Sequence, residues 1–105
     1  MSIREISTIK IGTVRYAVTH GKIEQKKEDS ILIGRILYDE GQIVAADHLP
    51  EDVCVSTVVH ECIHGLFHHS GNYQPSEEHI EGFATVLTAF MQDNPQLIEA
   101  IQELK

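Results

Sequence analysis

The first third of the chain alternates apolar and polar residues in the manner typical of β-strands. Between residues 3 and 18 the alternation is broken at Gly12 and Thr13, which indicates a bulge or a local turn. We therefore expect one long strand or two short strands in this stretch. Its apolar positions are Ile9, Ile11, Val14, Tyr16 and Val18. Residues 19–30 are mostly polar and predict a solvated connection with room for a short helical turn.

A second β pattern follows this connection. Residues 31–38 are rich in β-branched and large apolar side chains, and residues 42–46 form a shorter apolar run. Between them, Asp39, Glu40 and Gly41 form a turn signal. Two such runs around a short glycine-containing turn predict a β-hairpin.

The second half of the chain changes to the three- and four-residue spacing of amphipathic helices. The first helix is expected over residues 51–69, with Pro50 at its start and Gly71 as a left-handed cap. A second helix is expected from Ser76, a good N-cap residue, to Asp93. The first apolar stripe comprises Val55, Val58, Val59, Cys62, Ile63, Leu66 and Phe67. The second comprises Ile80, Phe83, Ala84, Leu87, Phe90 and Met91.

A third, short helix is expected after Pro95, over residues 96–104, and its apolar residues are expected to face inward. These are Leu97, Ile98, Ile101 and Leu104. Strands followed by helices predict an α+β fold in a single domain, residues 1–105. We expect a small antiparallel sheet, built from the N-terminal strand or strands and the hairpin, packed on the three helices.

Composition and charge narrow the classes of partner. The 105 residues have a formal net charge of -8, which argues against nucleic acids and anionic membranes, since both select basic surfaces. The sequence shows no apolar run long enough to span a membrane and no signal peptide, so a cytoplasmic location is the expectation. Cys54 and Cys62 are expected to be reduced, because eight helical residues separate them by roughly 12 Å.

The strongest chemical signal is the pentapeptide His60-Glu61-Cys62-Ile63-His64, an H-E-x-x-H motif within the first expected helix. Residues four apart lie on one helix face, so His60 and His64 can bind one Zn²⁺. Glu61 is placed to act as the general base toward a zinc-activated water. A catalytic zinc site needs a third protein ligand, and the second helix offers Glu77, Glu78, His79 and Glu81.

Three segments resemble the small gluzincin-type peptidases, the minigluzincins, which are relatives of the ImmA/IrrE-like metallopeptidases. They are the hairpin at residues 34–44, the motif region 57–65 and the acidic segment 77–84. The histidine extension of other zincin groups, H-E-x-x-H-x-x-G-x-x-H, is absent, because Phe67 and Ser70 occupy its glycine and histidine positions. Since the resemblance includes many phage proteins, it also implies a phage or prophage origin.

The resemblance implies which acid is the third ligand. In gluzincins this glutamate is followed four residues later by an acid or amide that orients a metal-bound histidine. Glu81, followed by Thr85, is the expected ligand. An alternative makes Glu77 the ligand and Glu81 its support, and Glu78 is a third possibility.

The expected function is that of a zinc-dependent metalloendopeptidase, with Glu61 catalytic and His60, His64 and Glu81 as metal ligands. The resemblance implies that a protein or peptide substrate binds extended beside a sheet edge, such as residues 42–46. Tyr73 and His79 are the candidates for stabilising an oxyanion. Two alternatives stay open: an inactive zinc-binding interaction module of the same fold, and a chain that binds no metal. The pattern leaves the oligomeric state undetermined.

Overall fold

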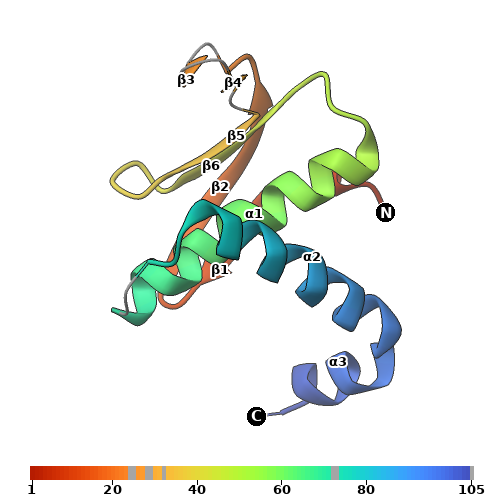
Figure 1. Cartoon of the computed structure of the whole chain (residues 1–105). Helices are drawn as coiled ribbons and strands as arrows, with labels where there is room; N and C mark the ends of the chain where they lie inside the picture. Colours follow the sequence, from red (N-terminus) through yellow and green to blue (C-terminus); the bar gives the residue numbers. More distant parts are fainter. Residues whose placement is uncertain (24–25, 28–29, 32, 72–73, 105) are drawn as a thin grey trace.

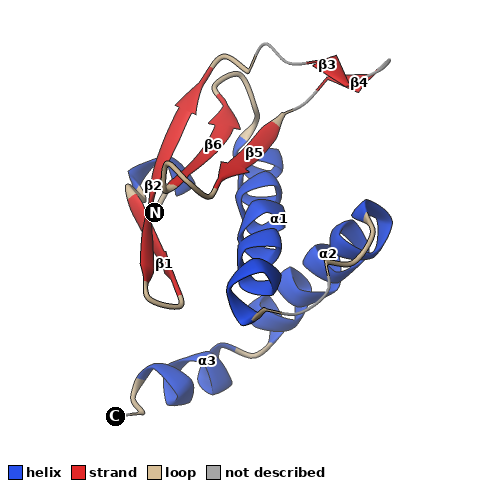
Figure 2. Ribbon diagram, turned by 90° about the vertical axis from the view of Figure 1, so that its left-hand side faces the viewer, coloured by secondary structure: helices blue, strands red, loops and turns tan. Residues whose placement is uncertain are grey.

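The computed structural model describes residues 1–23, 26–27, 30–31, 33–71 and 74–104. A four-stranded sheet lies on one side of a long helix, α1, and a second helix, α2, crosses the other side (Figures 1 and 2). The α+β class expected from the pattern is confirmed. None of the helices in the described ranges combines the length and apolarity needed to cross a membrane.

The sheet contains two N-terminal strands and one hairpin. The N-terminal stretch forms β1 (Thr8–Ile11) and β2 (Val14–Gly21), which pair antiparallel around Gly12, where φ is 62°. The hairpin forms β5 (Gly34–Leu37) and β6 (Gln42–Ala46). A separate pair, β3 (Lys26–Lys27) and β4 (Ser30–Ile31), occupies the connection where a solvated loop was expected. A short 3-10 turn, Ile3–Glu5, precedes the sheet.

The strand order is β1-β2-β6-β5, and β2 pairs with β6 in parallel. The expectation of a wholly antiparallel sheet is therefore wrong at this one pairing, and the sheet is mixed. The hairpin is inserted with β6 inward because residues 43–46 are all buried, whereas the strand β5 is only half-buried beyond Gly34. As a consequence β6 is hydrogen-bonded on both sides, and the expectation that residues 42–46 offer a free edge is wrong. The outer strand beside α1 is β5.

The helices follow their sequence signals closely. Helix α1 spans Glu51–Ser70, and Gly71 caps its end with φ 75°. Helix α2 spans Glu77–Asp93, and the Ser76 side chain accepts a hydrogen bond from the His79 backbone N–H. The main core lies between the sheet and α1, and the contact between α1 and α2 centres on Ile63, Ile80 and Ala84.

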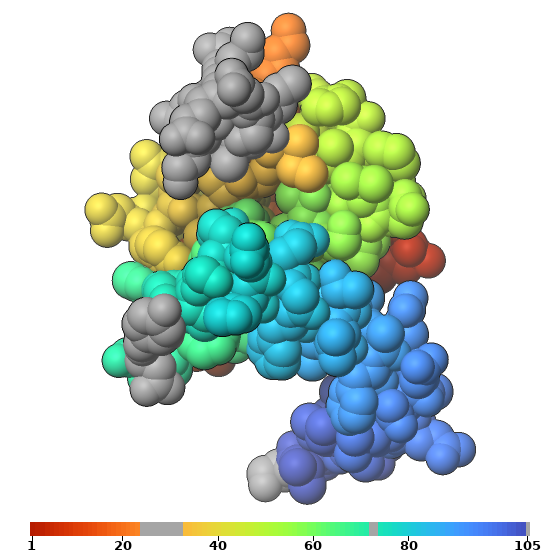
Figure 3. Space-filling view, viewed as in Figure 1, coloured from red at the N-terminus to blue at the C-terminus, as the bar shows by residue number. Residues whose placement is uncertain are grey.

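Helix α3 (Pro95–Gln102) departs from expectation. Of the four apolar residues expected to face inward, only Ile98 is half-buried, whereas Leu97, Ile101 and Leu104, which follows the helix, are 46%, 54% and 77% exposed. The helix folds back beneath α2 and projects from the body of the molecule (Figures 1 and 3). Helical spacing predicts an apolar stripe but does not say what covers it.

Two glycines allow α1 to approach the sheet closely. A Cβ on Gly65 would lie 2.7 Å from Ile11 Cδ1 and 3.1 Å from Ile36 Cδ1. A Cβ on Gly34 would collide with Thr57 Cγ2. Since the Thr57 hydroxyl donates to the Val53 carbonyl at 2.7 Å, this methyl group cannot turn aside without loss of that bond. The close approach of β5 to α1 therefore requires glycine at position 34.

We predict that Gly34→Ala lowers the free energy of unfolding by about 1–3 kcal/mol, measured by urea denaturation. The matched control is Gly21→Ala, because a Cβ there meets no described atom within 4 Å. Its effect should stay within about 0.5 kcal/mol. Thr57→Ser removes the colliding methyl group but keeps the hydroxyl, so it should recover most of the loss in the Gly34→Ala background. A loss that persists in the double variant would show that this contact is not the cause.

Candidate metal centre and catalytic cleft

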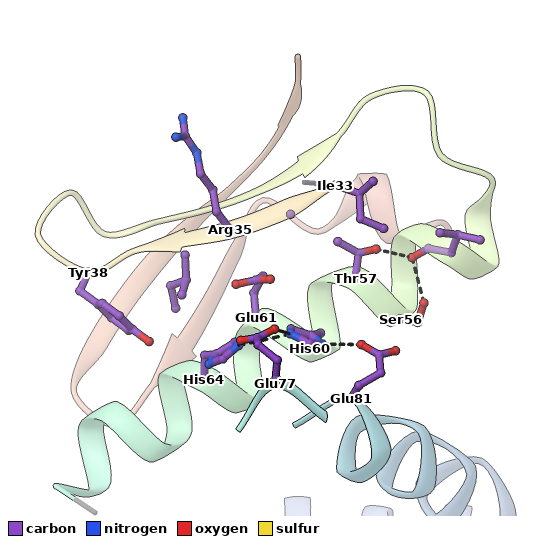
Figure 4. Close-up of a pocket in the computed structure, with 13 residues that line it drawn as sticks. Ile33, Arg35, Tyr38, Ser56, Thr57, His60, Glu61, His64, Glu77 and Glu81 are labelled. Atoms are coloured by element: carbon purple, nitrogen blue, oxygen red, sulfur yellow. Dashed lines mark hydrogen bonds and ion pairs between the residues drawn. The ribbon is translucent and has the colours of Figure 1, made fainter. Parts of the chain in front are cut away.

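The H-E-x-x-H motif lies on α1 where the helix faces both α2 and the outer strand of the sheet. His60 and His64 project from the same side of the helix, and their Nε2 atoms are 3.2 Å apart (Figure 4). The two side chains are only 14% and 18% exposed. The expected convergence of the two histidines is thus present in the folded chain.

The third member of this group is Glu77, the first residue of α2. Its Oε2 lies 3.1 Å from His60 Nε2, and its Oε1 lies 2.8 Å from His64 Nε2. Ligand atoms of His60, His64 and Glu77 all lie within 4.8 Å of one another, so these three residues could hold a metal ion. Because Glu77 is 69% exposed, the group is accessible from the side of α2.

Glu81, the expected third ligand, contacts the other nitrogen of His60. The Nδ1–H of His60 donates to Glu81 Oε2 at 2.7 Å. This geometry favours the alternative drawn from the i, i+4 spacing, in which Glu77 is the ligand and Glu81 supports the histidine. Glu78 lies exposed and makes no hydrogen bond or ion pair with the described residues. The Thr85 hydroxyl donates to the Glu81 carbonyl within α2 and does not reach the histidines.

Gln74 orients the second histidine, a role that no sequence pattern indicates. Its amide Nε2 donates to the His64 backbone carbonyl at 2.9 Å, which defines the orientation of the amide. Its Oε1 then faces His64 Nδ1 at 3.2 Å and accepts a hydrogen bond from it. Gln74 lies in the loop before α2, where a lone glutamine carries no recognisable pattern.

These contacts show how the two rings are held. Each Nδ1 faces an oxygen acceptor, Glu81 Oε2 for His60 and Gln74 Oε1 for His64. Each Nε2 faces the Glu77 carboxylate, and the two Nε2 atoms also face each other. With a metal bound at Nε2, the proton of each imidazole would lie on Nδ1, where the acceptor is already in place. The donor set, two imidazole nitrogens and one carboxylate, fits a divalent metal such as zinc.

Glu61 lies beside the histidines, in the space between α1 and β5 (Figure 4). The residue is 8% exposed, and burial raises the pKa of its carboxyl above the ordinary value. The neighbouring His60 and His64 lower this pKa, and the Glu77 charge raises it. A Cβ on Gly34 would lie 3.5 Å from Glu61 Oε2, so the absence of a side chain there leaves room around the carboxylate. A desolvated carboxylate of this kind is suited to accept a proton.

Both histidines, Glu61, Glu77 and Glu81 line one cavity of about 660 Å³. Its roof is the outer strand β5, its floor is α1, and the start of α2 closes one side (Figure 4). The polar residues that line it include Tyr38, Ser56, Thr57, His60, Glu61, His64, Glu77 and Glu81. The cavity has the size of a ligand site and brings acids, imidazoles and a strand edge together.

Tyr38 at the end of the hairpin strand is a second residue that the sequence did not single out. Its ring stacks on His68 of α1, with centroids 3.8 Å apart and an interplanar angle of 15°. The hydroxyl is directed toward Glu61 and His64 and makes no hydrogen bond with the described residues (Figure 4). Burial, followed by the charges of Glu61 and Tyr16, raises the pKa of Tyr38, so the phenol keeps its proton and can donate it. His79 is exposed outside the cavity, and Tyr73 lies outside the described residues.

Comparison of the chain with protein-family models, with curated protein sequences and with solved structures gave no match. The function is therefore inferred from the residues of the site and their geometry.

We predict that divalent zinc stabilises the folded protein in urea or thermal denaturation, by about 2.7 kcal/mol at a hundredfold excess over Kd. His64→Ala and Glu77→Gln should reduce this stabilisation strongly, because each removes one member of the group. Glu81→Gln should weaken binding by about 10–100-fold through loss of the support for His60. Glu78→Gln is the matched control, since it makes the same change one residue away and should bind zinc as the wild type does. Full zinc binding by Glu77→Gln would exclude Glu77 as a ligand.

Proposed function

We propose that this protein is a zinc-dependent metalloendopeptidase, with His60, His64 and Glu77 as metal ligands and Glu61 as the general base. The observation that carries the proposal is the meeting of two imidazole Nε2 atoms and the Glu77 carboxylate beside the buried Glu61 in one cavity. The resemblance of the hairpin, the motif and the acidic helix to minigluzincins supports the same function.

The roles of the residues follow from their positions. A zinc ion in the group would act as a Lewis acid and acidify a water molecule near the substrate carbonyl. Glu61 accepts the proton of the attacking water and later transfers it to the leaving amine. Glu81 and Gln74 accept hydrogen bonds at Nδ1 and so orient the histidine rings with both Nε2 atoms directed at the metal position. Tyr38 donates a hydrogen bond to the carbonyl oxygen as negative charge develops on it.

The substrate in this proposal is an extended peptide that pairs with β5. This strand is bonded to β6 on one side, and residues 34–36 line the cavity on the other. An outer strand presents unpaired backbone donors and acceptors, which an extended peptide can satisfy by strand addition. The same position places the peptide backbone along the cavity that Glu61 and the histidines line. The zinc peptidase would thus cleave a chain held along the sheet edge.

The alternative is an inactive zinc-binding module of the same fold. Within the described chain, α2 buries only Ile80 and Ala84 completely, and it packs on α1 around Ile63. A metal shared by His60, His64 and Glu77 would tie the two helices together and stabilise the fold without any catalysis. A variant that keeps metal binding distinguishes the two functions, because only a peptidase would lose hydrolysis in it.

Glu61→Gln distinguishes a peptidase from an inactive zinc-binding module. We expect the variant to keep zinc binding and stability but to lose peptide hydrolysis by about 10²–10⁴-fold, because the amide cannot accept the proton. Hydrolysis is measured with a denatured protein substrate and with quenched-fluorescent peptides, and Glu78→Gln serves as the active control. Wild type that binds zinc but cleaves neither class of substrate would support the inactive module. Equal cleavage by Glu61→Gln would exclude Glu61 as the base.

Tyr38→Phe tests the hydrogen-bond donor. The variant keeps the ring stack on His68, so the fold and zinc affinity should be unchanged. We expect kcat to fall by about a hundredfold with little change in KM, because the lost bond acts on the developing charge. A rise in KM with unchanged kcat would show instead that Tyr38 only binds the substrate.

A further inference from the structure

The second and third helices carry an apolar surface that the rest of the described chain does not cover. Six large side chains from α2 and the α3 segment are between 46% and 77% exposed. We call them the C-terminal apolar face: Phe83, Val86, Phe90, Leu97, Ile101 and Leu104. None of the residues of α3 is buried. Figure 3 shows these two helices extending from the body of the molecule.

The size of this surface points to a protein contact. Side chains of about 150–200 Å², each roughly half-exposed, leave on the order of 500–600 Å² of apolar area. This is at the upper limit of the largest apolar patch on a typical monomer. A two-fold contact between two such faces would bury more than about 1,000 Å², which is the lower range of specific interfaces.

We propose that the C-terminal apolar face is the contact surface of a homodimer, in which the α2–α3 hairpins of two copies pack together about a two-fold axis. Two hairpins supply four helices, an arrangement that buries apolar stripes well. Leu97 and Ile101 lie four residues apart on one side of α3, and Leu104 follows the end of the helix; Glu99 and Glu103 fall between these positions in the sequence. The stripe itself therefore carries no charge that would repel a second copy.

The charge of the chain opposes the approach of a second copy and determines how salt affects the contact. Residues 36–104 contain no Lys or Arg, so the surroundings of the face are acidic. On α2, however, Glu77 and Glu81 are turned toward the histidines and do not border the stripe. An apolar contact within an acidic chain should be strengthened by salt, because salt screens the repulsion between the two copies. A contact with a basic partner would weaken with salt.

The test is analytical ultracentrifugation of the full chain from about 1 µM to about 200 µM, at low and high ionic strength. We expect the mass to rise from 11.8 kDa for the monomer toward twice that value, with dimer formation favoured by salt. Ile101→Glu and Phe90→Glu should each weaken dimerisation by at least about tenfold, since each places a charge in the contact. Both positions are half-exposed, and thermal unfolding at low concentration verifies that the variants fold.

Gln96→Glu is the matched control, because it adds the same charge to α3 outside the apolar stripe and should leave the dimer intact. A wild type that stays monomeric at every concentration would overturn the proposal. So would a dimer that is insensitive to both Ile101→Glu and Phe90→Glu, or one that dissociates with salt. A monomer that binds a Lys/Leu amphipathic helical peptide, with binding abolished by Ile101→Glu, would assign the face to a basic partner instead.

Discussion

The site depends on the contacts between the His60 imidazole and two acids of α2, one at each ring nitrogen. Glu81 accepts the Nδ1 proton at 2.7 Å, and Glu77 faces Nε2 at 3.1 Å. The first contact orients the ring, and the second brings a carboxylate to the nitrogen that would bind a metal. Gln74 orients the His64 ring in the same way. The first turn of α2 and Gln74 in the loop before it therefore arrange two histidines and one acid as a group that could hold a metal ion.

The second constraint is the distance between α1 and the sheet. Gly34 and Gly65 bring β5 and β1 against the helix, and any side chain at either position would meet a neighbouring side chain. This approach buries Glu61 while the cavity keeps the carboxylate accessible. Burial raises the pKa of Glu61 and makes the carboxylate a better proton acceptor, which is the property a general base needs. The same approach places the free edge of β5 along the cavity.

Helix α2, which supplies two acids to the site, and the following α3 bury few of their side chains. Within the described residues, α2 contributes only Ile80 and Ala84 to the core, and α3 contributes none. A shared metal and a second copy of the chain would each stabilise this region, from opposite sides of α2. The proposed metal site and the proposed dimer contact therefore lie on one helix, although neither depends on the other.

The sequence by itself determined the α+β class, nearly all helix ends, the hairpin and the histidine pair, because these follow from local spacing, caps and turns. Only the tertiary structure decided the parallel pairing of β2 with β6, the choice between Glu77 and Glu81, and the roles of Gln74 and Tyr38. Glu77 and Glu81 lie on the same side of α2, so spacing cannot distinguish them. The crossing of α2 over α1 determines which carboxylate meets Nε2 and which meets Nδ1. The exposure of α3 could not be predicted either, because the spacing of apolar residues does not show which surface, if any, covers them.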